Sequence, residues 1–151
     1  KMIINLEKGS IITSKIIEEN IGLSKDYNVF ELNKALGERN LIRSYQIANH
    51  FSKNEKGHPL QMTIPAIYRF FSQLLLFLSL RNMPPNQVAS KMGINPFFLK
   101  DYQKASNNYN QKKIARIISA LKDADLQAKG VISSSMTSDD ILKELIFKIL
   151  H

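Results

Sequence analysis

The chain has no cysteine among its 151 residues and only six glycines. Without cysteine it can form neither a disulfide framework nor a thiolate metal site, which is consistent with a reducing cytoplasm. The glycines are isolated from one another, and neither Gly-x4-Gly-Lys-Ser/Thr nor Gly-x-Gly-x-x-Gly occurs. The sequence therefore shows no phosphate-binding or dinucleotide-binding loop.

Long hydrophobic runs are also lacking. The most apolar stretch, 70–80, lies between Arg69 and Arg81 and has about half the length that spans a bilayer. The first residues, Lys-Met-Ile-Ile, do not have the architecture of a signal peptide. We expect a soluble, cytoplasmic protein that makes no membrane contact.

Residues suited to catalysis or metal binding are few. The three histidines are His50, His58 and His151, and none has carboxylates at a metal-ligand spacing. The acidic pairs 18–19 and 139–140 fall on an exposed helix face and in a first helical turn, where acids are ordinary. We expect no catalytic residue, no metal ion and no cofactor.

Positive charge is plentiful and unevenly distributed. The formal net charge is +8, and residues 61–130 carry ten Lys or Arg against three acids. Such a basic segment could meet nucleic acid or an acidic protein surface. Its cations are spread singly along the segment, which favours a solvated helical surface.

The hydrophobic pattern predicts an all-α fold, because apolar residues recur at spacings of three and four and no segment alternates like a strand. Thr63 is expected to cap the longest helix and Ser138 the last. The segments expected to be helical are 2–6, 13–22, 28–37, 38–53, 63–82, 85–93, a helix from 95, 110–129 and a final helix after 138.

Residues 84–130 have the clearest helix start and stop signals. Pro85 suits a first helical turn, Gly93 a helix end, and Asn95 a cap before Pro96. Ala89, Gly93 and Leu99 have the spacing of a helix-turn-helix motif. Any tight corner between two helices needs the same packing, so this block could be a DNA-binding motif over residues 85–107 or part of a helical assembly domain.

The second helix of this corner argues against DNA. A recognition helix presents polar or basic side chains from its first turns to the bases and phosphates. Here Phe97, Lys100 and Asp101 would face the DNA if Leu99 packs inward, and an exposed Phe and an acid are poor choices against phosphates. Phe97 and Phe98 suit packing better than base contact.

Three motifs resemble one known family. They are Asn28-Val29-Phe30-Glu31-Leu32 with Ala35-Leu36, Pro85-x-x-Val88-Ala89-x-x-Met92-Gly93-x-x-Pro96-Phe97, and Ala124-Asp125-x-x-x-Lys129-Gly130. With the apolar helix 63–82 and the terminal apolar helix, they are similar to the C-terminal region of the bacterial DNA polymerase III delta subunit, a clamp-loader component. Family-signature residues with expected structural roles are Asn28, Phe30, Ala35, Ala89, Gly93, Pro96, Asp125 and Gly130.

The resemblance implies a non-catalytic helical collar at 25–151, preceded at 1–24 by the end of a helical lid domain. It implies association with other clamp-loader subunits of the gamma/tau and delta-prime types, and at most weak, non-specific DNA contact. The sliding clamp would be contacted by an N-terminal region that this sequence lacks. Candidate subunit-interface residues, expected to remain after the core is filled, are Phe70, Phe77, Phe97 and Phe98.

Overall fold

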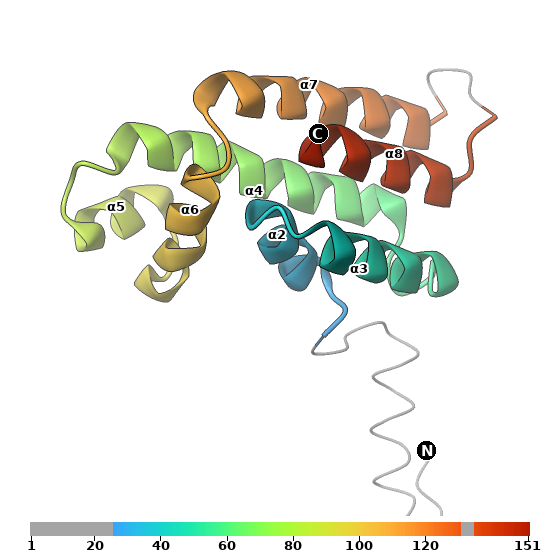
Figure 1. Ribbon diagram of the computed structural model, residues 1–151, viewed down its shortest axis with the longest axis horizontal. Helices are drawn as coiled ribbons and strands as arrows, with labels where there is room; N and C mark the ends of the chain where they lie inside the picture. The colour runs from blue at the N-terminus through green and yellow to red at the C-terminus, as the bar shows by residue number, and fades with distance from the viewer. Residues whose placement is uncertain (1–25, 131–134) are drawn as a thin grey trace, which may run out of the picture.

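The computed structural model describes residues 26–130 and 135–151, and these form helices without any strand (Figure 1). The helices predicted at 2–6 and 13–22 lie outside the described residues. The elements are α2 (Val29–Gly37), α3 (Leu41–Lys53), α4 (Leu60–Leu80), α5 (Pro85–Met92), the short 3₁₀ helix η1 (Pro96–Phe98), α6 (Leu99–Ser106), α7 (Gln111–Ala128) and α8 (Ser138–Leu150).

The long helix α4 runs through the middle of the domain (Figure 1). Helix α7 packs along it, α8 packs on α7, and α3 packs on α8. Helix α2 contacts both α3 and α6, and α5, η1 and α6 form a separate corner on one end of α4. The domain therefore has a helical bundle at one end of α4 and the corner of α5, η1 and α6 at the other.

The sequence of α4 explains its central place. Eight of its residues are buried, and they include Ile64, Ile67, Phe71 and Leu74. By length and composition alone this helix could cross a membrane. That test is weak evidence here, because the core helix of a soluble protein passes it too. In this domain the apolar face of α4 packs against α7 and the helical corner.

Two predicted caps are wrong. Helix α4 begins at Leu60, and Thr63 lies inside it with its hydroxyl donating to the Pro59 carbonyl at 3.2 Å. Helix α8 is capped by Thr137, which forms a capping box with Asp140. Thr137 satisfies the first amide groups of α8 one position before the predicted cap, whereas α4 follows Pro59 without any side-chain cap. Sequence spacing alone does not distinguish these starts from the predicted ones.

Helix α3 begins three residues later than predicted. Arg39 has a left-handed backbone with a φ of 54°, which ends α2 and separates it from α3, and Asn40 then caps α3. The Arg39 guanidinium donates to the Leu150 carbonyl at the end of α8. This contact compensates for the strained backbone by capping another helix.

Candidate subunit-interface surface

The corner between α5 and α6 is built by a glycine turn. Gly93 has a φ of 70°, and its N–H and that of Ile94 donate to the last carbonyls of α5. Ala89 and Leu99, which have the spacing noted in the sequence, are both buried, and α5 and α6 each pack against η1 between them. The structure therefore has a compact helical corner at this point.

The short helix η1 holds two phenylalanines outward. The Asn95 side chain accepts from the Phe97 N–H at 2.9 Å, with Pro96 in the first position. The rings of Phe97 and Phe98 meet edge to face at 5.4 Å, and 64% of Phe97 and 48% of Phe98 are exposed. Both are therefore available for contact with a partner.

Lys100 adds a positive charge to this corner. Its Nζ lies 4.3 Å from the centroid of the Phe97 ring, close enough for a cation–π interaction. The sequence placed this lysine on the same side as Phe97 but gave it no role. Its position three residues after Phe97 on a helical segment was the signal for a contact between them.

Phe70 and Phe77 correct the prediction made for them. They are only 8% and 4% exposed, so they are not left over after the core is filled. The Tyr102 ring from α6 stacks on Phe70 at 5.1 Å and lies 6.4 Å from Phe77. Burial also raises the pKa of Tyr102. These two phenylalanines hold the helical corner on α4.

The contact between α2 and α6 is very close. A Cβ on Gly37 would lie 3.1 Å from Cζ of Phe70 and 3.2 Å from Cβ of Ala105. Next to it, the buried Tyr109 hydroxyl donates to the Leu36 carbonyl at 2.6 Å, and burial strongly raises the pKa of Tyr109. The end of α2 is thus fixed against the end of α6.

Most family-signature residues have local structural roles in the described part of the chain. Asn28 caps α2 by accepting from the Glu31 N–H at 2.9 Å, and Ala35 is buried. Asp125 pairs with Lys129 at 2.8 Å in the last turns of α7. Gly130 follows with a φ of 74°, a conformation that suits glycine at a helix end.

Phe30 is the exception. A structural role was expected for it, but 78% of this residue is exposed. It lies in the first turn of α2, on the stripe of the buried Asn33 and Gly37, at a level that no described segment covers. Nothing in the described fold needs an aromatic ring at this position. Phe30 therefore needs an explanation outside the domain's own core.

One polar cavity brings together residue types found in enzymes. It has a volume of about 310 Å³ and is lined by Ser52, His58 and Asp139, among others. However, the single Ser52 hydroxyl proton is shared between the Asp139 carboxylate and the Ala48 carbonyl, and the His58 ring lies flat on Phe51 at 3.9 Å. The contact between Ser52 and Asp139 joins α3 to α8, so the arrangement has a structural explanation.

The Asp139 carboxylate is stabilised in its charged form. The hydrogen bond from Ser52, followed by the contacts with Lys143, lowers the pKa of Asp139. Such an acid in the first turn of α8 suits the helix dipole rather than proton transfer near neutral pH. Within the described residues no group of three or more His, Asp or Glu side chains could hold a metal ion.

The fold and its exposed features define an all-helical packing domain with an outward aromatic corner. The chain belongs to the family of the DNA polymerase III delta subunit, C-terminal domain, whose model matches residues 26–149. This confirms the resemblance found in the sequence and gives no support to the alternative of a helix-turn-helix regulator over 85–107.

A solved structure shares the fold. The Bacillus subtilis DNA clamp loader delta protein (YqeN) is similar over 84% of this chain with a TM-score of 0.66 and 20% identity. The match covers 37% of that protein, so this chain corresponds to little more than a third of its length. Comparison with curated proteins finds no match.

Proposed function

We propose that this domain acts by protein–protein contact, joining a delta-type subunit to the other subunits of a replicative clamp loader. The observation that carries the proposal is the family match over residues 26–149. The partners we propose are subunits of the gamma/tau and delta-prime types, and the setting is the cytoplasm. In this proposal residues 25–151 form a collar, and residues 1–24 are the end of a preceding lid domain.

The arrangement of side chains supports a role without catalysis in this domain. Two side chains that line the cavity, Ser52 and Asp139, form a hydrogen bond that joins α3 to α8. At the helical corner, Phe97 and Phe98 are exposed. Exposed aromatic residues are common anchors at protein interfaces. The domain would thus contribute shape and apolar surface to assembly.

Reconstitution tests this proposal. The natural protein would be mixed with purified gamma/tau-type and delta-prime-type subunits of the same organism, and the products measured by size-exclusion chromatography with light scattering. We expect a stable complex that disappears when residues 26–149 are deleted. Separate elution of all subunits would contradict the proposal.

Binding to duplex DNA tests the alternative function of a DNA-binding regulator. Binding followed by fluorescence anisotropy at about 50 mM and about 200 mM salt separates sequence-specific from non-specific attraction. We expect weak binding that is lost at the higher salt concentration. Sequence-dependent binding that persists would favour the DNA-binding alternative.

A further inference from the structure

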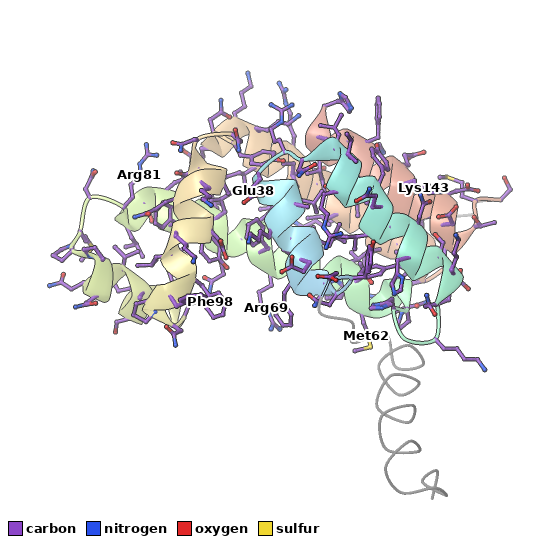
Figure 2. All side chains as sticks on the ribbon, turned by 60° about the horizontal axis from the view of Figure 1, so that its bottom comes forward. Glu38, Met62, Arg69, Arg81, Phe98 and Lys143 are labelled. Carbon is purple, nitrogen blue, oxygen red and sulfur yellow. The ribbon has the colours of Figure 1, made fainter. Side chains whose placement is uncertain are left out.

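Helices α2 and α6 begin at the same edge of the domain. Their ends meet at Gly37 and Ala105, and Glu38 lies 3.8 Å from Lys104 just beyond. Both helices run in the same direction in Figures 1 and 2. Phe30 in α2 and Phe98 in η1, which leads directly into α6, each precede that meeting point by seven residues, so they lie at a similar level. Packed helices are roughly 8–10 Å apart, which places both rings within reach of one partner helix.

Helix α4 contributes to the same edge. Asn33 of α2 donates to the Ala66 carbonyl of α4 at 3.4 Å, and Met62 and Arg69 lie four residues before and three after Ala66 on the same helical stripe. Figure 2 shows Phe98, Arg69 and Met62 along one edge of the molecule. The edge is therefore continuous across three elements.

The exposed apolar side chains of this edge are Phe30, Met62, Phe97 and Phe98, of which 78%, 71%, 64% and 48% are exposed. We call these four residues the aromatic edge. Large apolar residues gathered on one exposed surface mark an interaction site more often than isolated ones do. No described part of the chain covers them.

The charges beside the aromatic edge indicate the chemistry of its partner. Neither Arg69 nor Lys100 belongs to an ion pair in the part of the chain that the structure describes, and Lys100 lies over the Phe97 ring. Two cations outside ion pairs, on a surface with exposed apolar side chains, complement carboxylates on an apolar surface. Nucleic acid fits less well, because a continuous phosphate backbone would also pass Glu31 and Asp101 on the same elements, whereas a protein can place a few carboxylates opposite Arg69 and Lys100 alone.

We propose that the aromatic edge is the surface that binds a neighbouring clamp-loader subunit, and that this partner presents an apolar helix face flanked by carboxylates. The inference rests on the proposed function and assigns it to particular side chains. This binding role would explain why an aromatic residue stands at the exposed position of Phe30, where it has no function in the domain's own core. Phe30 and Phe98 would be the two anchors, and Arg69 and Lys100 would orient the partner.

The test uses the natural protein and the same gamma/tau-type and delta-prime-type subunits. Variants Phe30→Ala and Phe98→Ala would be compared with the wild type by measuring the dissociation constant of the complex. Because anchors at interface centres dominate affinity, we expect each variant to raise that constant about tenfold or more. Arg69→Glu should also raise it, with the larger effect at low salt concentration.

Matched controls come from the opposite edge. Ile42 and Phe147 are 75% and 55% exposed, and both lie near the end of the domain where Arg39 contacts Leu150. We expect Ile42→Ala and Phe147→Ala to change the dissociation constant less than about threefold, as residues outside an interface do. Circular dichroism melts of every variant would establish that the fold is retained.

The outcomes separate the two proposals. If the wild type forms the complex but Phe30→Ala and Phe98→Ala bind like the wild type, the aromatic edge is overturned and the assembly function stands. If the control variants weaken the complex equally, the assignment to this edge is also overturned. If the wild type does not bind the subunits, both proposals fail. If Phe97→Ala instead abolishes tight binding to single-stranded DNA, the partner is nucleic acid and the inference is wrong.

Discussion

Replacing Gly37 with alanine has two opposite effects on stability, a gain in helix propensity and a steric overlap of the new methyl group with its neighbours. Alanine stabilises a helix by roughly 0.5–1 kcal/mol relative to glycine when there is space for the methyl group. Here the new Cβ would lie 3.1 Å from Cζ of Phe70 and 3.2 Å from Cβ of Ala105. Both distances are shorter than ordinary contacts between carbon atoms, so one neighbour must move.

Neither neighbour can move easily. The Phe70 ring is stacked on Tyr102 at 5.1 Å and meets Phe71 edge to face at 5.3 Å. The Cβ of Ala105 is fixed to the backbone of α6. Overpacking of a closed site costs roughly 1–3 kcal/mol, which exceeds the gain in helix propensity. We therefore expect Gly37→Ala to lower the free energy of unfolding by about 1 kcal/mol.

Urea and thermal unfolding of the 151-residue chain, followed by far-UV circular dichroism, would measure this change. A loss of about 1 kcal/mol corresponds to a decrease in Tm of roughly 3–5 °C for a domain of this size. Lys34→Ala on the exposed side of α2 is the matched control and should change stability by less than about 0.5 kcal/mol.

A double-variant cycle would identify the cause. Phe70→Leu removes the ring atoms nearest the new methyl group, so Gly37→Ala should cost clearly less in that background than in the wild type. The reasoning is refuted if Gly37→Ala stabilises the domain like an unhindered helix glycine, or if its cost is the same with and without the Phe70 ring.

Three further predictions concern other contacts. Tyr109→Phe should lower the free energy of unfolding in urea by about 1 kcal/mol, because the buried hydroxyl loses its bond to Leu36; unchanged stability would show that this bond contributes nothing. Asn110→Ala should cost about 1 kcal/mol in the same assay, since its side chain caps α7; equal stability would contradict the cap. The pKa of Asp139 is lowered in the fold, mainly by Ser52, so its contribution is present above about pH 4 and lost as the pH falls through the folded pKa. In melts from pH 7 to pH 3, the stability difference between wild type and Asp139→Asn should therefore shrink below about pH 4; a constant difference would exclude this linkage.

Local signals predicted much of the fold. Asn95 caps a helix as expected, and Asn28 and Asn110 cap the helices that were predicted to begin at them. Gly93 adopts the left-handed turn that its position indicated. These features depend on residues within four positions of one another, so sequence spacing is sufficient to find them. Cap assignments failed where two neighbouring residues could serve, as at Thr137 and Ser138.

Of the four phenylalanines that the sequence suggested for the interface, only two are exposed. Phe70, Phe77, Phe97 and Phe98 have the same chemistry in the sequence, and only the position of Tyr102 separates the first two from the others. Phe30 was expected to have a structural role as part of the family-signature motif. Its exposure depends on where the neighbouring elements end relative to the first turn of α2, and the α2 segment alone does not reveal this.

The sequence by itself determined the helical class, most helix ends and the family, because hydrophobic spacing, capping residues and motif order are local properties of the chain. Tertiary structure decided which apolar residues are buried and which remain exposed. That outcome depends on contacts between segments far apart in sequence, such as Asn33 with Ala66 and Phe70 with Tyr102. The aromatic edge exists only because the fold brings α2, α4 and η1 to one edge, and no single segment of the sequence contains it.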